Sequence, residues 1–162
     1  PGYIGTMLLA NGFCKKLVLA DINPEAIRMQ RKTIEKNKLE DYVKSYHSDV
    51  FDNIPNDEKF DLVVGNPPHF QLDHKVGNTK LGEINLKAYD PDWKIHEKFF
   101  LNVKNYMKPG GYVVLQENTM GGMDVNTFKN MIEIGGGKFV DWIPTKKING
   151  YTNPIYYLVV QY

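Results

Sequence analysis

The residues best suited to chemistry lie in one short stretch, Asn66-Pro67-Pro68-His69. An apolar run with β-branched residues, Leu62-Val63-Val64, precedes them and predicts a strand buried on both faces. The two prolines fix two φ angles and remove two backbone donors, so they make a rigid corner directly after this strand. In open α/β sheets, ligands bind at the carboxyl ends of the strands, which is where this corner lies.

The corner is suited to holding an –NH2 group. The side-chain oxygen of Asn66 and the carbonyl oxygen of Pro67 can accept its two N–H groups. An amide or aryl amine is a poor nucleophile because its lone pair is delocalised, and accepting both hydrogens favours the pyramidal nitrogen of the transition state. An ordinary turn that ends a strand is the alternative, and a motif this short leaves both interpretations open.

The stretch VVGNPPHF resembles the [DN]-P-P-aromatic signature of class I S-adenosylmethionine (SAM)-dependent methyltransferases that modify planar amines. These include adenine-amine methyltransferases of DNA and RNA and glutamine methyltransferases that act on release factors. The resemblance implies that Asn66 and Pro67 hold the target amine and that Pro68 rigidifies the loop. His69 stands where the signature has Tyr, Phe or Trp, and with Phe70 it would stack on or orient the substrate. The implied reaction requires no metal.

A second set of residues is typical of a nucleotide-binding loop. Gly2 and Gly5 match the last two glycines of G-x-G-x-x-G, and Asp21 ends the predicted strand Lys16–Asn23, about twenty residues later. A carboxylate at that position accepts hydrogen bonds from both ribose hydroxyls. Capping of the next helix is the alternative role for Asp21, although Asn23 can cap that helix itself.

The resemblance implies SAM as the cofactor. The Gly2–Gly5 loop would approach its methionine part near a helix start, and Asp49 would face the adenine amine; a solvated loop aspartate is the alternative for Asp49. The predicted cofactor-binding residues are Gly2, Tyr3, Gly5, Asp21, Ile22, Asp49, Val50 and Asn66.

The elements that must position these residues follow from apolar spacing and turn residues. Helices are predicted over Thr6–Gly12, Pro24–Lys38, Trp93–Lys108 and Asp124–Ile134, and strands over Lys16–Asn23, Lys44–Val50, Tyr112–Glu117, Phe139–Ile143 and Ile155–Gln161, besides the apolar run before the corner. The last two strands are joined by a turn too short for a crossover helix, which predicts an antiparallel pair. The expected fold is therefore α/β and Rossmann-like: the class I methyltransferase fold, with a mostly parallel sheet, helices on both faces and a C-terminal antiparallel hairpin.

The chain is expected to be one SAM-dependent methyltransferase domain over residues 1–162. The first glycine of the loop and the strand before it are absent, and no initiating methionine is present. We therefore expect an N-terminally truncated domain, whose native polypeptide extends upstream of Pro1 with an apolar strand.

Composition limits the protein class. With 42% hydrophobic and 24% charged residues the chain is globular, and its net charge of +1 argues neither for nor against a nucleic-acid partner. One cysteine, Cys14, excludes an internal disulfide framework and fits a reducing cytosol. No apolar run approaches membrane-spanning length, so we expect a cytoplasmic protein without a membrane partner. The oligomeric state cannot be read from the sequence.

The polar segment Gln71–Asp92 follows the corner directly and is predicted to be a substrate-gripping lid, since long loops in compact domains are usually functional or disordered. Asp73 and His74, with His69, form a possible metal cluster within or beside it. Their spacing on a loop is not diagnostic of a metal site, so no metal is expected.

Three functions compete on this evidence. The leading one is an amine-directed SAM methyltransferase whose partner is a nucleic acid or a protein, with RNA, DNA, protein glutamine and small molecules all open as substrates. The second is a dinucleotide-dependent oxidoreductase, against which the corner and the terminal hairpin argue. The third is a non-catalytic methyltransferase-like binding module.

Overall fold

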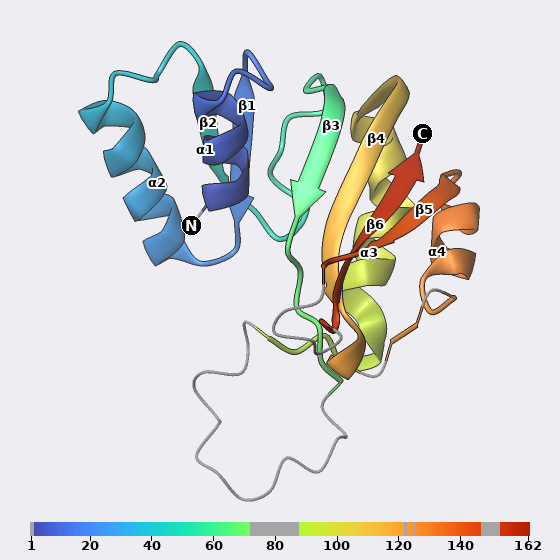
Figure 1. Cartoon of the computed structure of the whole chain (residues 1–162). Helices are drawn as coiled ribbons and strands as arrows, with labels where there is room; N and C mark the ends of the chain where they lie inside the picture. The colour runs from blue at the N-terminus through green and yellow to red at the C-terminus, as the bar shows by residue number, and fades with distance from the viewer. Residues whose placement is uncertain (1, 72–87, 122, 125, 147–152) are drawn as a thin grey trace, which may run out of the picture. The chain divides into compact units, whose positions relative to one another are not determined.

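The computed structural model describes residues 2–71, 88–121, 123, 124, 126–146 and 153–162 (Figure 1). The chain forms two compact units, Pro1–Glu58 and Lys59–Tyr162.

The first unit pairs two parallel strands and two helices. Its elements are α1 (Tyr3–Ala10), β1 (Leu17–Asp21), α2 (Pro24–Lys36) and β2 (Val43–His47). The strands pair in register from Leu17 with Val43 to Asp21 with His47. Because they run in the same direction, Asp21 and the loop after His47 lie at one edge.

The start of α2 follows from its sequence. The Asn23 side chain accepts the N–H of Glu25 at 3.0 Å, and Pro24 occupies the first turn. Ala26, Ile27 and Gln30 form its buried face. The prediction that Asn23 caps this helix is confirmed.

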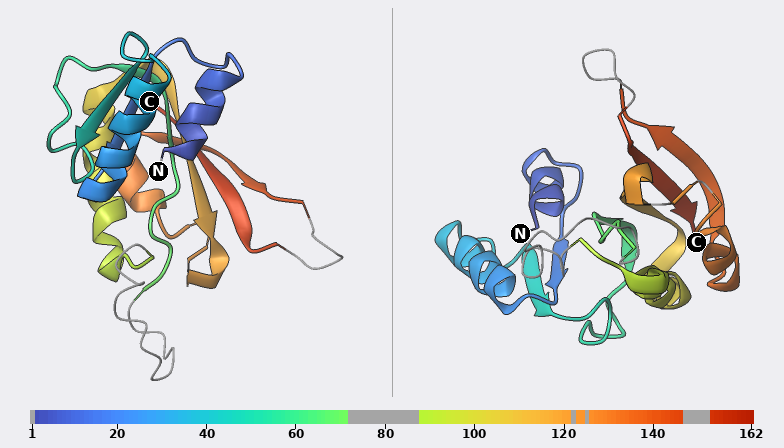
Figure 2. Two further views of the ribbon diagram at one scale, coloured as in Figure 1. Left: turned by 90° about the vertical axis from the view of Figure 1, so that its left-hand side faces the viewer. Right: turned by 90° about the horizontal axis from the view of Figure 1, so that it is seen from below.

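The second unit is built on a four-stranded mixed sheet. Its main elements are β3 (Phe60–Gly65), α3 (Lys94–Val103), β4 (Met107–Asn118), α4 (Lys129–Ile134), β5 (Lys138–Pro144) and β6 (Ile155–Gln161), with 3-10 turns η2 (Pro91–Trp93), η3 (Lys104–Tyr106) and η4 (Thr119–Gly121). The strand order is β3-β4-β6-β5. β3 and β4 are parallel, whereas β6 runs antiparallel to both β4 and β5. Helices α3 and α4 contact each other on the same face of this sheet (Figure 2).

The prediction of an antiparallel pair of C-terminal strands is confirmed by β5 and β6. The α/β class with parallel pairing is also present, because β1 pairs with β2 and β3 with β4 in parallel. The described sheets are mixed overall, and a single mostly parallel sheet with helices on both faces stays a prediction. The one-domain assignment and the upstream strand also stay predictions.

The two helices of the second unit are shorter than predicted. The helix predicted to reach Lys108 ends at Val103, and β4 begins at Met107, so Pro109-Gly110-Gly111 lies inside a strand. The reason is long-range pairing, since Gly110 N–H donates to the Tyr162 carbonyl at 2.8 Å and Tyr162 N–H donates to the Gly111 carbonyl at 3.0 Å. Local sequence cannot reveal that pairing.

The helix predicted from Asp124 begins only at Lys129. The carboxylate of Asp124 instead accepts the N–H groups of Asn126 and Thr127, at 2.7 and 3.1 Å. This side-chain hydrogen bonding offers the backbone an alternative to a helical turn.

The core of the second unit lies between the sheet and its two helices. Phe100 and Val103 of α3, Phe128, Ile132 of α4, and Val113, Leu115, Leu158 and Val160 of the sheet are all buried. Among the described residues, no helix is long and apolar enough to cross a membrane.

Candidate functional site

The Asn66-Pro67-Pro68 corner lies at the carboxyl end of β3, as predicted. Gly65, the last residue of β3, pairs with Leu115 of β4, which sets Asn66 beside Gln116. The Gln116 side-chain amide donates to Asn66 Oδ1 at 3.4 Å. A carbonyl oxygen has two lone pairs, so the exposed Asn66 side chain keeps a second acceptor site. Gln116 was not identified from the sequence, because only the strand register brings it to the corner.

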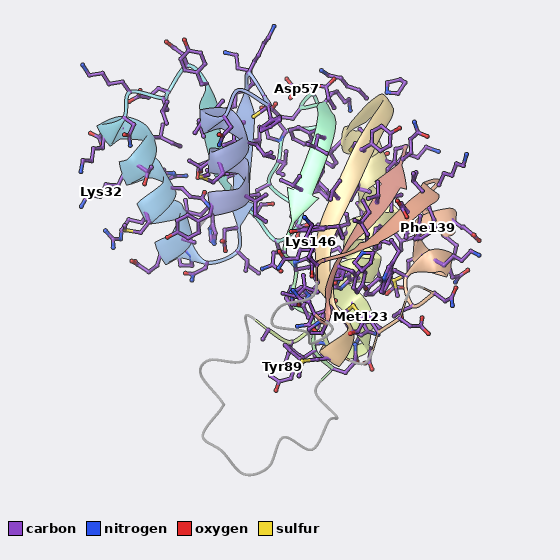
Figure 3. The ribbon with its side chains drawn as sticks, viewed as in Figure 1. Lys32, Asp57, Tyr89, Met123, Phe139 and Lys146 are labelled. Atoms are coloured by element: carbon purple, nitrogen blue, oxygen red, sulfur yellow. The ribbon has the colours of Figure 1, made fainter. Side chains whose placement is uncertain are left out.

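The chain beyond the corner is tied to the segment Ala88–Asp90. The N–H groups of His69 and Phe70 both lie 2.9 Å from the Ala88 carbonyl, and Asp90 N–H donates to the Phe70 carbonyl at 2.9 Å. The rings of Phe70 and Tyr89 are 6.2 Å apart. Tyr89 and Met123 are labelled in Figure 3 at this end of the second unit. Residues 72–87 of the predicted lid, with Asp73 and His74, lie outside the described residues.

Gly121 of η4 lies against the backbone of His69. A Cβ atom built on Gly121 would lie 1.5 Å from the carbonyl oxygen of His69, so η4 and the corner touch backbone to backbone. Only glycine permits this approach. Sequence reasoning did not identify Gly121, since nothing local marks it.

The imidazole of His69 faces a buried polar chain. His69 Nδ1 is 3.4 Å from Glu117 Oε2, and Glu117 Oε1 is 3.1 Å from His96 Nε2. His96 Nδ1 is in turn 2.6 Å from Asp90 Oδ2. Asp90, His96 and Glu117 are 0%, 1% and 0% exposed. The proximity of these three residues was not predicted, since they come from a loop, α3 and β4.

The pKa of His96 is raised above its ordinary value. Burial opposes the charged form and is the largest single effect, but hydrogen bonds to Asp90 and Glu117 and their negative charges together outweigh it. A buried charge is tolerated only when it is paired and hydrogen-bonded, and His96 meets both conditions.

The predicted cofactor residues of the first unit share one edge. Cβ atoms built on Gly2 and Gly5 would approach Leu19 at 2.9 Å and Leu17 at 2.7 Å, so α1 runs opposite to β1 and begins at the Asp21 end. Gly2 has φ 76°, a left-handed conformation that glycine adopts readily. The first N–H groups of α1 have no partner within the helix and are therefore available at this edge.

Asp21 has one carboxylate oxygen committed locally. Its Oδ1 accepts the N–H of Asn23 at 2.9 Å, and the side chain is partly exposed. Ile22 beside it is 64% exposed. Since the Asn23 side chain caps α2, the second oxygen of Asp21 is not needed for capping. The ribose role of Asp21 nevertheless stays a prediction.

The loop after β2 carries backbone strain at a predicted cofactor residue. Val50 has φ 52°, which a β-branched side chain rarely adopts. Ser48 holds this conformation, because its hydroxyl donates to the Val50 carbonyl and accepts the N–H of Asn53, both at 3.0 Å. Strain of this kind is concentrated at ligand sites, and Asp49 lies within the strained turn.

The groups at this edge fit SAM chemically: open N–H groups for a carboxylate, and an acidic side chain for ribose hydroxyls. Gly2, Tyr3, Gly5, Asp21, Ile22, Asp49 and Val50 belong to the first unit and Asn66–Phe70 to the second, so the contribution of Asn66 to cofactor binding stays a prediction. Within the described part of the chain, no group of three His, Cys, Asp or Glu residues could hold a metal ion.

Comparison with known proteins gives one family match. The family model described as methyltransferase small domain matches residues 1–133. A putative protein N5-glutamine methyltransferase of Methanocaldococcus jannaschii is 28% identical over 126 residues, which are 74% of this chain and 60% of that protein. The release factor glutamine methyltransferase of Clostridium acetobutylicum is 28% identical over 145 residues, 83% of this chain and 48% of the relative. The chain thus spans about half the length of these relatives.

Solved structures share the fold. A crystal structure of a putative methyltransferase complexed with SAH superposes with a TM-score of 0.61 at 17% identity, covering 91% of this chain and 39% of that one. At this identity the similarity concerns the fold alone.

Proposed function

The chain belongs to the methyltransferase small domain family, and from that premise we propose that it methylates the side-chain amide nitrogen of a protein glutamine. Membership confirms the resemblance to class I SAM-dependent methyltransferases and SAM as the cofactor. The finer assignment, to an N-methyltransferase acting on a protein amide, is our proposal.

The observation that carries the proposal is the corner itself. Asn66 Oδ1 is an exposed acceptor, held by Gln116 at the carboxyl end of β3. The next residue, Pro67, contributes a second carbonyl, and neither Pro67 nor Pro68 has an N–H to compete for it. Two fixed acceptors match the two N–H groups of a primary amide.

The proposed mechanism depends on positioning. SAM, when bound, supplies an electrophilic methyl group. Asn66 and Pro67 accept the two N–H groups of the substrate amide, which withdraws its lone pair from conjugation and points it out of the amide plane. Acceptors that bind the pyramidal nitrogen more strongly than the planar one lower the barrier. No covalent intermediate with the protein is needed.

The substrate class rests on relatives. Both relatives named above are glutamine methyltransferases by name, and a glutamine amide fits a clamp built for a planar –NH2 group. An adenine amine presents the same two N–H groups, so methylation of adenine is the other outcome of the test below.

The test is transfer of a labelled methyl group from SAM to glutamine-containing peptides and to adenine-containing oligonucleotides, with glutamine methylation expected. Asn66→Ala should reduce turnover by about 10²–10³-fold, the range for loss of one preorganised hydrogen-bonding group. SAM affinity measured by calorimetry should fall far less than turnover. Asn102→Ala, which removes an exposed amide from α3, is the matched control.

Three results would contradict the proposal. Full turnover in Asn66→Ala would refute the amine clamp. Methylation of the oligonucleotides alone would show that adenine, and not glutamine, is the substrate. Binding of NAD in place of SAM would favour the oxidoreductase alternative.

A further inference from the structure

The buried chain Asp90–His96–Glu117 has a protonation state that its geometry dictates. Both ring nitrogens of His96 lie within hydrogen-bond distance of carboxylate oxygens, at 2.6 and 3.1 Å. An ionised carboxylate only accepts hydrogen bonds, so both nitrogens donate and the ring is an imidazolium. The ring is also stacked on Phe128, with centroids 4.2 Å apart, which fixes its plane.

Asp90 is an acceptor at both oxygens. Its Oδ1 accepts the N–H of Ile95 at 2.8 Å, and its Oδ2 accepts the backbone N–H of His96 at 3.0 Å in addition to the ring. Asp90 is therefore ionised and fixes the start of α3. One imidazolium lies between two carboxylates, so the three side chains Asp90, His96 and Glu117 together carry one uncompensated negative charge in a buried environment.

His69 is the partner available to that charge. Its Nδ1 lies 3.4 Å from Glu117 Oε2, the carboxylate oxygen opposite the one that binds His96. The His69 side chain is 15% exposed, whereas Glu117 is 0% exposed, so His69 connects the buried charge to the surface at the corner. Such hydrogen bonds are often long without substrate and tighten in the complex.

The other titratable groups near this chain do not neutralise it. Tyr156 of β6 pairs with Glu117 across the sheet, and its pKa is raised by burial, by Glu117 and by Asp124, so it stays uncharged. Asp124 adds negative charge.

We propose that Glu117 is a positioning residue that makes His69 the proton acceptor of the methyl transfer. Donation from Nδ1–H to Glu117 leaves the lone pair on Nε2, which has no protein partner among the described residues. The proposal rests on the proposed function, because it assigns to His69 the proton that an amide must lose. It also gives a reason for His69 at the position where the signature has Tyr, Phe or Trp.

The chemistry balances as follows. The amide nitrogen lone pair forms the N–CH3 bond, and the methyl–sulfur bond breaks with its electron pair going to sulfur, which becomes a neutral thioether. As the nitrogen becomes positively charged, one of its two N–H protons leaves the carbonyl oxygen that accepted it and passes to Nε2 of His69. The resulting imidazolium of His69 neutralises the surplus charge of Glu117, and the proton later leaves to solvent.

The first test needs no substrate. Imidazole ¹⁵N chemical shifts of the wild-type chain, with the His69 signal assigned by its loss in His69→Gln, should show a protonated Nδ1 and an unprotonated Nε2 when the ring is neutral. The opposite tautomer would overturn the proposal without any variant at Glu117.

The second test repeats the ¹⁵N measurement on Glu117→Gln, a nearly isosteric change whose fold is checked by the amide spectrum. Loss of the carboxylate should lower the fraction of His69 that is protonated at Nδ1. Glu97→Gln removes an exposed carboxylate next to His96 in sequence and should leave the His69 tautomer unchanged. An unchanged His69 tautomer in Glu117→Gln would overturn the pairing of His69 with Glu117.

Activity measurements test the proton-acceptor role separately from the hydrogen bond between His69 and Glu117. In Glu117→Gln the kcat should fall about 10²-fold or more, in the range of general-base effects, and the KM for SAM should stay at the wild-type value. A His69–Glu117 hydrogen bond confirmed by NMR together with an unaltered kcat in Glu117→Gln would refute the proton-acceptor role. If no glutamine is methylated by the wild type, the proposed function fails and this role fails with it, whatever the NMR result.

Discussion

At the scale of the residue, capping of α2 and the predicted binding of ribose belong to different side chains, Asn23 and Asp21. Both are suited to cap α2, and only Asn23 does so, through Glu25 N–H at 3.0 Å. Asp21 accepts the Asn23 N–H with Oδ1, at the end of β1 beside which α1 begins. The two positions can therefore be tested against each other.

We predict that Asp21→Ala weakens SAM binding by about 1.5–3 kcal/mol, the cost of a charged hydrogen-bond pair, or roughly 10- to 150-fold in Kd. Asn23→Ala should instead lower the free energy of unfolding by about 1 kcal/mol, through the lost cap, and leave SAM affinity in place. Calorimetry measures the first effect and thermal unfolding the second. Equal SAM affinity in wild type and Asp21→Ala would remove the ribose role.

Residue types and spacing were sufficient to predict the corner and its neighbours along the chain. Asn66-Pro67-Pro68 follows a strand because that feature is local. The first helix was placed three residues late, since α1 already begins at Tyr3, inside the predicted Gly2–Gly5 loop, and ends at Ala10. Gln116 and Glu117 were not predicted, since their roles depend on β3 pairing with β4 in one particular register. Sequence alone shows which residues can react, whereas residues that orient them are defined by pairing across the sheet.

At the scale of the element, prediction failed where a distant strand determines the local structure. Pro109-Gly110-Gly111 is a strong helix stop, yet it lies in β4 because Tyr162 pairs beside it. The end of the Trp93–Lys108 helix was therefore placed five residues late, as it ends at Val103. The hairpin β5–β6 was predicted well, because a short connection permits only antiparallel pairing.

We predict that Gly121→Ala displaces the corner, because the added methyl group would lie 1.5 Å from the His69 carbonyl oxygen. A misplacement near 1 Å in a positioning mechanism costs about 10²-fold in turnover. SAM affinity should change far less than turnover.

Met120→Ala tests whether that effect is specific. Met120 is the preceding residue of η4 and is 70% exposed, so its truncation should leave turnover near the wild-type value. Methyl transfer and calorimetric SAM binding are measured for both variants. Wild-type turnover in Gly121→Ala would show that η4 does not fix the corner.

At the scale of the whole molecule, the two predicted sites belong to different compact units. The cofactor residues Gly2 to Val50 lie in the first unit, and the corner and its buried polar chain lie in the second. Both tryptophans, Trp93 and Trp142, are in the second unit, and Trp93 lies 5.4 Å from His96. Tryptophan fluorescence therefore reports unfolding of the unit that contains the polar chain.

His96 links the stability of that unit to pH. Its pKa is raised in the folded state above the ordinary value of 6.5, so the folded state holds its proton more tightly than the unfolded chain does. The stabilisation is fully present below pH 6.5 and is lost as pH rises through the raised pKa. We therefore predict that the free energy of unfolding, measured by urea titration with fluorescence detection, falls as pH increases above 6.5.

His96→Gln should remove this dependence on pH. It should also destabilise the protein by about 3–5 kcal/mol, because Asp90 and Glu117 would remain buried without their cation. His47→Gln is the control, since His47 is exposed in the first unit, where its Nε2 lies 2.9 Å from the Ile22 carbonyl. That variant should keep the wild-type slope of stability against pH above 6.5. If His96→Gln shows the same slope as wild type, His96 is not the imidazolium that the two carboxylates require.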